Sequence, residues 1–327
     1  MEEHYKKIQS RLRSFQKKDE NMAIRQILIT AIPFILLFIG CFFVYDYNKW
    51  LCLFFAPIIA SYMSRLFMFM HDCGHRTFFK NNKANEYLGN ILGFFLLVPF
   101  GMWKYIHIIH HASAGNLDKR DKNPDLWTMT VKEYIESKWH EKLFYKIYRS
   151  HFMWLFIIPN FIFFILFRIP HKKLNKIAKK TVLIHDLLYV LIILLVTLFI
   201  PLSKLLFIYM PPLLLAFSLG GWIFYIQHQY EETYWASDKE WSFEEASLKG
   251  SSFWKMPKLL QWITANIGFH HVHHLNMNIP NYNLEEAHNA IVDLIDINPI
   301  PIEKTFTHLK FKLWDEEKKK LIRYKDI

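Results

Sequence analysis

The sequence contains only three cysteines, Cys41, Cys52 and Cys73, and all three lie in or beside apolar segments. No disulfide framework follows from so few thiols. The first 22 residues are charged and lack the short apolar region of a secretory signal, so we expect the N-terminus to stay in the cytoplasm. No internal repeat, low-complexity tract or glycine/serine linker interrupts the chain, which predicts a single domain over residues 1–327.

The chain also lacks any recognised nucleic-acid-binding motif and the glycine-rich fingerprint of a dinucleotide site. Its net charge is +11, and hydrophobic residues make up 52% of the sequence. These hydrophobic residues are gathered into long blocks, and most of the lysines and arginines lie between the blocks. This distribution favours contact with anionic lipid headgroups over contact with nucleic acid.

Several of the apolar blocks have the length of a transmembrane helix, for which about 20 residues are needed. The predicted spans cover residues 24–45, 50–70, 183–200 and 204–226. Two further blocks, 88–103 and 152–167, are predicted to be interfacial or re-entrant helices. Positive charge flanks the second of these on both sides, as expected of a segment that enters and leaves on the cytoplasmic side. The predicted fold is an all-α integral membrane protein with four transmembrane helices, interfacial helices and a cytoplasmic histidine-rich cap.

Histidine is concentrated in three short clusters. They read HDCGH at 71–75, HIIHH at 107–111 and HHVHH at 270–274, and His228 follows the last predicted span. On a helix, positions i, i+3 and i+4 share a face, so His270, His273 and His274 would converge while His271 turns away. Several neutral imidazoles on one face are typical of a metal site.

The position of these clusters along the chain constrains the topology. All four histidine groups can share one metal centre only if they lie on the same side of the membrane. The first two spans form an out-and-back hairpin, and the other groups stay on that side if 88–103 and 152–167 do not cross. We therefore expect very short outer loops near 46–49 and 201–203.

The number of histidines indicates two metal ions with four or five nitrogen ligands each. The nine candidates are His71, His75, His107, His110, His111, His228, His270, His273 and His274. A structural zinc site needs only four ligands and usually includes cysteine. Imidazole alone does not choose between iron, copper and zinc. Acyl chains are the abundant substrate at a membrane, however, and breaking an unactivated C–H bond requires an oxidant made from O₂, which iron can supply and zinc cannot.

With these three boxes the chain resembles the integral-membrane fatty acid desaturases, whose hallmark is HxxxH, HxxHH and HxxHH. The neighbouring segments 115–120, 127–131, 225–231 and 279–282 look most like bacterial acyl-lipid desaturases of the Δ12/omega-6 type. The resemblance covers roughly residues 25–290. It implies a non-haem di-iron centre, O₂ as co-substrate, a cytoplasmic active site in a bacterial inner membrane, and introduction of a cis double bond into a membrane acyl chain.

Carried over residue by residue, the family's ligands fall on the eight histidines of the boxes, and His228 matches an additional ligand after the last span. His271 falls on a non-ligand position and is expected to be a neighbouring or solvent-exposed residue. The first box departs from the usual family pattern because Arg76, Thr77 and Phe78 follow it. Metal-bound histidines usually donate their other ring nitrogen to an oxygen. Residues near enough in sequence to accept are Asp72, Asp118, Glu231, Glu232 and Asn266.

The chain carries no haem-binding His-Pro-Gly-Gly motif, so the resemblance implies a separate electron donor of the ferredoxin or cytochrome b5 type. Two other functions remain open. One is a hydroxylase or ketolase on the same scaffold, acting on a lipid, alkane or carotenoid, which the context of residues 112–131 and 225–231 disfavours. The other is a membrane metal-binding or transport protein, which would usually place ionisable residues along a path within the spans. The lipid profile of an expressing host separates the three.

Overall fold

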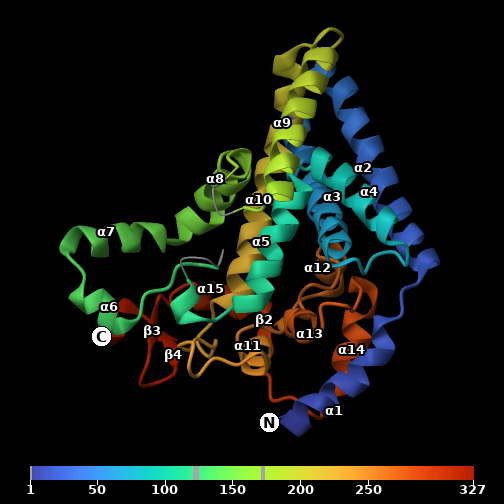
Figure 1. Ribbon diagram of the computed structural model, residues 1–327. Helices are drawn as coiled ribbons and strands as arrows, with labels where there is room; N and C mark the ends of the chain where they lie inside the picture. The colour runs from blue at the N-terminus through green and yellow to red at the C-terminus, as the bar shows by residue number, and fades with distance from the viewer. Residues whose placement is uncertain (1, 121–124, 171–173) are drawn as a thin grey trace.

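The computed structural model describes residues 2–120, 125–170 and 174–327. The described chain is mostly helical, and four of its helices are long and apolar enough to cross a membrane. These are α2 (Glu20–Asn48), α3 (Trp50–His75), α9 (Lys176–Thr197) and α10 (Leu202–His228). Each contains most of the run predicted for it, and the expected all-α membrane architecture is confirmed. All four extend toward the top of Figure 1.

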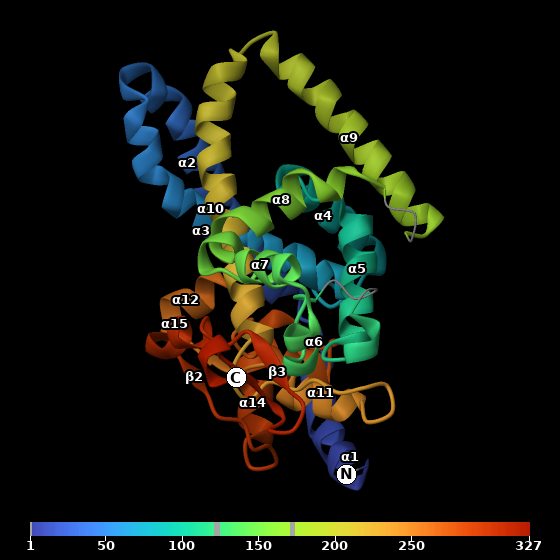
Figure 2. The same ribbon diagram turned by 90° about the vertical axis from the view of Figure 1, so that its left-hand side faces the viewer.

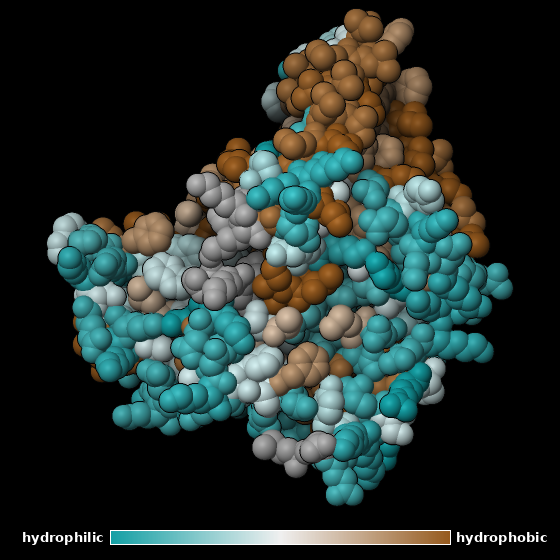
Figure 3. Space-filling model, viewed as in Figure 1, coloured by the Kyte–Doolittle hydropathy of each residue, from teal (hydrophilic) through white to brown (hydrophobic). Residues whose placement is uncertain are grey.

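The surfaces of these helices are apolar where those of a soluble protein would be polar. Leu36, Phe43, Phe54 and Phe199 are between 66% and 82% exposed. Figure 3 shows the same contrast, with hydrophobic side chains covering the upper part of the molecule and hydrophilic ones the lower part. Exposed apolar surface costs about 25 cal/mol per Å² in water, so a patch of this extent is stable only in lipid. The protein is therefore a membrane protein.

The two helical hairpins turn at the same end of the molecule. Lys204 Nζ, at the start of α10, lies 2.6 Å from Asp46 Oδ2 near the end of α2. The rings of Tyr45 and Phe207 lie 5.6 Å apart in the same region. Because α3 ends at His75 and α10 at His228, the histidines lie at the opposite end of the hairpins from these turns. This arrangement is the one that the topology argument requires.

The apolar block predicted over 88–103 consists of two helices, and the predicted boundaries are wrong. Helices α4 (Asn82–Phe95) and α5 (Phe100–Ser113) meet at an angle of 106°. Pro99 disfavours a helical backbone at the residue before it, and Leu97 adopts a left-handed φ of +55°. The bend directs α5 back toward the ends of α3 and α10, and the second histidine box lies within α5 rather than after the apolar block.

The block predicted over 152–167 is also interrupted. Helix α7 (Trp139–Tyr148) is followed by a π-helical turn at Met153–Ile157, helix α8 (Ile158–Phe164) and a 3₁₀ turn that ends at Arg168. Helix α7 and the segment Met153–Arg168 meet at an angle of 54°. If each bent pair counts as one broken span, the number of possible crossings rises from four to six. The count of four therefore stays a prediction.

A polar cap surrounds the histidine end of the spans, at the bottom of Figures 1 and 2. Its helices are α1 (Glu2–Leu12), α6 (Val131–Glu136), α11 (Phe243–Lys249), α12 (Lys258–Ile263), α13 (His270–Leu275), α14 (Leu284–Ile291) and α15 (Thr305–His308). Its strands are β1 (Trp254–Lys255), parallel to β2 (Ile300–Pro301), and β3 (Leu313–Asp315), antiparallel to β4 (Lys320–Ile322). Strands of two or three residues leave too little alternation in the sequence to be predicted.

The charged N-terminal segment is part of this cap. Ile8 and Leu12 of α1 are fully buried in a hydrophobic cluster with Val272, Leu284 and Ile291 from α13 and α14. The apolar stripe of α1 is thus covered by the cap, which leaves its charged side chains facing outward. Its position places α1 directly against the helix that carries the third histidine box.

Candidate metal centre

The first histidine box forms the last turn of α3, where His71 and His75 lie one turn apart on the same face. Gly74, between them, lies against Trp103 of α5. A Cβ atom at Gly74 would lie only 2.8 Å from the indole ring, so this approach requires glycine. The Trp103 ring stacks on His107, with 4.6 Å between the ring centroids. The first two boxes are therefore in close contact through Trp103.

Nine imidazoles converge in two clusters, in each of which the candidate ligand nitrogens lie within 4.8 Å of one another. The five-histidine cluster consists of His71, His75, His107, His111 and His273. The four-histidine cluster consists of His110, His228, His270 and His274. The structure thus brings together all nine histidines singled out from the sequence. One expectation is wrong: His273 does not join His270 and His274 in the four-histidine cluster but belongs to the five-histidine cluster.

Several nitrogens in these clusters have no hydrogen-bond partner although they are buried. They are the Nε2 atoms of His75, His110 and His274, which face the clusters, and the Nδ1 atoms of His111 and His270. Buried polar atoms are nearly always satisfied in native proteins, so unsatisfied nitrogens that converge indicate a missing partner. His228 Nδ1 lies 2.8 Å from the carbonyl oxygen of Gly250 and donates to it, which leaves a lone pair on His228 Nε2 directed into the cluster.

The spacing of the nitrogens also fits a metal shell. His71, His107, His111 and His273 follow one another with 3.0 Å between successive Nε2 atoms. His228 and His270 have their Nε2 atoms 2.9 Å apart. A metal–nitrogen bond of about 2.0–2.1 Å and a right angle between neighbouring bonds give about 3 Å between nitrogens. The residues present therefore fit two metal ions.

Burial keeps the third box in the protonation state that binds metal. Desolvation, followed by the neighbouring imidazoles, lowers the pKa of His270, His273 and His274 well below the usual histidine value. These rings are neutral at physiological pH, and a neutral imidazole has the free lone pair that a metal requires.

A carboxylate not singled out from the sequence contacts the four-histidine cluster. Asp125 Oδ1 forms a short hydrogen bond with His110 Nδ1, and its side chain is buried. Burial alone would raise the pKa of Asp125, but the adjacent His110 lowers it below its usual value. This contact orients His110 so that Nε2 points into the cluster. Asp125 lies 14 residues after His111 in a loop, and no feature of the sequence distinguishes it from nearby polar residues.

Asp72 has the corresponding place beside the five-histidine cluster. Its Oδ1 lies 3.2 Å from His71 Nδ1, and its Oδ2 accepts hydrogen bonds from the backbone and side-chain nitrogens of Asn281 at 2.8 and 2.9 Å. Asn281 also accepts a hydrogen bond from Gln26 of α2 at 3.0 Å. Asp72 therefore links the first box to α2 and to the loop before α14.

The other expected partners bond elsewhere. Asp118 accepts from the backbone of Asp238, Glu231 pairs with Lys320, Glu232 accepts from Asn298, and Asn266 donates to the carbonyl of Asn281. These contacts connect loops of the cap, so their closeness in sequence to a histidine does not translate into contact with an imidazole.

His271 is not part of either cluster, as expected, but it does not face solvent. Its side chain is fully buried, and its Nε2 lies 3.0 Å from Nδ1 of His288 in α14. His288 received no role from the sequence. The His271–His288 pair connects the third box to α14 on the side that faces away from the metal clusters.

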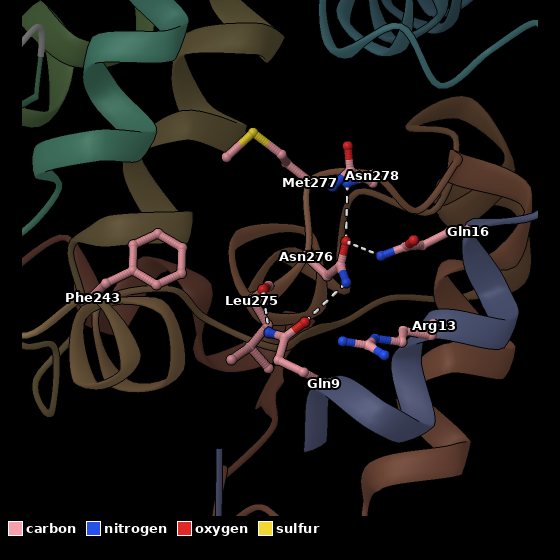
Figure 4. Close-up of a pocket in the computed structure, with 8 residues that line it drawn as sticks. All are labelled: Gln9, Arg13, Gln16, Phe243, Leu275, Asn276, Met277 and Asn278. Atoms are coloured by element: carbon pink, nitrogen blue, oxygen red, sulfur yellow. Dashed lines mark hydrogen bonds between the residues drawn. The ribbon is translucent and has the colours of Figure 1, made fainter. Parts of the chain in front are cut away.

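A pocket of about 380 Å³ opens on the outer side of the third box, between α1 and the chain that leaves α13. Figure 4 shows Asn276 at its centre. Gln9 Nε2 donates to the carbonyl of Leu275 at 2.7 Å and Gln9 Oε1 accepts from Asn276 at 3.0 Å, while Gln16 donates to Asn276 at 3.1 Å. The pocket is lined by none of the nine histidines. Its amide network holds α1 onto the end of the third box.

Comparison with known proteins agrees with this geometry. The family model for fatty acid desaturase matches residues 48–305, which contain all three boxes and His228. The chain belongs to the fatty acid desaturase family. This desaturase is 35% identical to the fatty acid desaturase of Bacillus subtilis, over 98% of this chain and 91% of that protein.

Other relatives are more specific in name. The sn-1 oleoyl-lipid 12-desaturase of Synechocystis sp. is 26% identical over 89% of this chain and 81% of its own length. The sn-1 acyl-lipid omega-3 desaturase (ferredoxin) of Nostoc sp. is 29% identical over 69% of this chain and 63% of its own length. The protein is accordingly an oxidoreductase, a membrane-bound fatty acid desaturase with a histidine centre that could hold metal.

Proposed function

We propose that this desaturase is a di-iron enzyme that introduces a cis double bond into the acyl chain of a membrane lipid. The observation that carries the proposal is the convergence of nine imidazoles into two clusters at one end of four apolar helices, in a chain of the desaturase family. The five-histidine cluster would hold one iron and the four-histidine cluster the other. Bound iron supplies the O₂-dependent chemistry that an unactivated C–H bond requires.

The protein's own residues prepare this site in three ways. The buried imidazoles of the third box stay neutral, so no proton has to leave them when metal binds. Asp72 and Asp125 fix the orientation of one histidine in each cluster. Trp103, which is only 7% exposed, covers His107 and packs edge-on against Phe67, and so excludes water from one side of the five-histidine cluster.

Electrons must come from another protein. Removal of two hydrogen atoms from the acyl chain, together with O₂, two electrons and two protons, gives one double bond and two molecules of water. The sequence shows no haem or dinucleotide motif, so the two electrons arrive from a separate carrier. We propose a donor of the ferredoxin or cytochrome b5 type. The name of the Nostoc relative, which includes ferredoxin, supports the first of these.

The proposed substrate is a glycerolipid acyl chain, and the proposed position is Δ12, or omega-6. The Synechocystis relative is named for the 12-position of an oleoyl lipid, whereas the name of the more similar Bacillus relative states no position. Mass spectrometry of dimethyl disulfide adducts locates a double bond directly. A product unsaturated at another carbon contradicts the position while leaving the desaturase assignment intact.

The proposed setting is the inner membrane of a bacterium, with the histidine end of the molecule in the cytoplasm. Residues 1–327 are proposed to form one domain. The lysines and arginines between the apolar blocks support this orientation through the positive-inside rule.

The deciding experiment is expression of the chain in a bacterial host that has no desaturase, together with a compatible electron donor. We expect new double bonds in the membrane lipids, and their loss when His228 is replaced by alanine. His140→Ala, which changes an exposed histidine of α7, is the matched control and should desaturate at the parent rate. New hydroxyl groups in place of double bonds would assign the chain to the hydroxylase class, and unchanged lipids would contradict an acyl-chain oxidase.

A further inference from the structure

Arg149, the residue that follows α7, is fully buried without a carboxylate partner among the residues that the structure describes. A buried charge without an opposite charge costs several kcal/mol unless hydrogen bonds satisfy it. The neighbouring amine of Lys312, which is 5% exposed, offers no opposite charge either, and its Nζ donates to the carbonyl of Arg149 at 2.5 Å. The hydrogen bonds of the guanidinium must therefore account for its presence.

The guanidinium joins segments that are far apart in the sequence. Its Nη2 donates to Gln229 Oε1 at 2.6 Å, and its Nη1 donates to Thr128 Oγ1 at 3.2 Å. Gln229 Nε2 lies 3.3 Å from the same Thr128 hydroxyl, which closes a triangle of three side chains. Longer contacts, at 3.4 Å, reach the carbonyls of Trp127 and Phe311. Only the planar fork of an arginine can serve this set of acceptors at once.

Both partners in this triangle lead directly to the four-histidine cluster. Gln229 follows His228 in the chain, and both are buried at the end of α10. The hydroxyl of Thr128 also bonds the carbonyl of Leu126 at 3.0 Å, and the preceding residue, Asp125, bonds His110. The rings of His110 and His228 lie 4.6 Å apart. The position of the loop that contains Asp125, relative to the end of α10, thus sets the position of His110 relative to His228.

We propose that Arg149 is a positioning residue for the four-histidine cluster: it fixes Thr128 against Gln229, and through them Asp125 and His110 against His228. Arg149 does not touch the site itself. The five-histidine cluster is built from α3, α5 and α13 and receives no contact from this triangle. The inference rests on the metal-binding role proposed above, and it predicts that a change at Arg149 affects one metal and spares the other.

The test is the metal content of the purified full-length protein, measured by elemental analysis. We expect Arg149→Met to halve the metal per chain relative to the parent. Arg149→Lys keeps the charge but replaces the two fork nitrogens, which bond Gln229 and Thr128 separately, by one ammonium on a shorter side chain, so it should show the same loss. Lys312→Met is the matched control, because it removes a hydrogen bond to the Arg149 backbone in the same buried site but leaves the three side chains of the triangle unchanged, and it should keep the parent metal content.

A double variant separates positioning from a general effect on the fold. If Arg149 acts through the four-histidine cluster, Arg149→Met in a His228→Ala background should retain as much metal as His228→Ala alone. Full metal content in both Arg149 variants, loss of both metals, or failure of both variants to insert into the membrane would overturn the inference. A parent protein that binds no metal would contradict the proposed function, whereas a parent with both metals and unaffected variants contradicts only the role of Arg149.

Discussion

Replacement of His228 by alanine tests the composition of the metal centre most directly. His228 lies outside the three boxes, and the structure places it among four imidazoles, with its Nε2 atom 2.9 Å from that of His270. The substitution reduces the four-histidine cluster to three. It also removes the donor to the carbonyl of Gly250 and leaves that oxygen buried and unsatisfied.

The size of the effect follows from these contacts. Loss of a residue that merely supports a ligand weakens metal binding or activity by about 10–100-fold, so loss of a ligand should exceed about 100-fold. The unsatisfied carbonyl adds about 1–3 kcal/mol of destabilisation, which is modest beside the insertion of four apolar helices. We therefore expect His228→Ala to accumulate in the membrane, to lose the metal of its cluster and to form no detectable double bonds.

The assay combines elemental analysis of purified protein with the lipid profile of the host. His228→Gln is the informative second variant, because glutamine keeps most of the volume and can still donate to Gly250 but offers no imidazole. Equal loss of metal in both variants attributes the effect to ligation. If His228→Ala desaturates lipid at near the parent rate, His228 is not a ligand and the reasoning from the nitrogen distances is wrong.

Three further predictions address other parts of the chain. Tags near residues 47 and 202 should be reachable from outside the cytoplasm, and tags near 120, 175 and 310 should not; an external 175 would show that the second bent helix pair crosses the membrane. Gln9→Ala removes the hydrogen bonds of Gln9 to Leu275 and Asn276 at the end of the third box, which should lower the free energy of unfolding by about 1–2 kcal/mol. The melting temperature in detergent should therefore fall, and an unchanged melting temperature would show that α1 does not support the box. Burial, followed by the adjacent arginine, lowers the pKa of Lys312 to about 6. Between about pH 10.4 and pH 6 the amine is protonated in the unfolded chain but neutral in the folded one, so the free energy of unfolding decreases as pH falls through this range. Lys312→Met should remove that loss and melt at least about 2 °C higher at pH 7, whereas the same pH dependence in both proteins would contradict a neutral buried amine.

The sequence was most informative where a helix repeat dictates geometry. The four spans and the three boxes depend on runs of apolar residues and on spacings of three and four, and both follow directly from the dimensions of a helix. A single histidine after an apolar run does not by itself indicate a ligand, and His228 became a candidate only because the three other histidine clusters indicate a metal site. The helix hairpins then place His75 and His228 at the same end, as the topology argument expected.

Contacts between loops were beyond the reach of the same reasoning. Asp125 and Gly250 contact histidines of the four-histidine cluster from irregular segments, where spacing along the chain does not determine distance in space. The bend between α4 and α5 depends on Pro99 and a left-handed Leu97; the proline is visible in the sequence, but the backbone conformation of Leu97 and the angle of 106° are not. Burial of Ile8 in α1 likewise depends on the cap that covers it.

The division of the histidines explains why two boxes with the same spacing are needed. In the second box, the first and last histidines belong to the five-histidine cluster and the middle one, His110, to the other. In the third box the assignment is reversed, and the middle one, His273, joins the five-histidine cluster. The second and third boxes therefore each contribute to both clusters from a single helix, and the contact between α5 and α13 fixes the distance between the two sites. The first box adds both of its histidines to one cluster, so the other needs a ligand from elsewhere. His228, at the end of α10, supplies it, which makes the last span part of the metal centre.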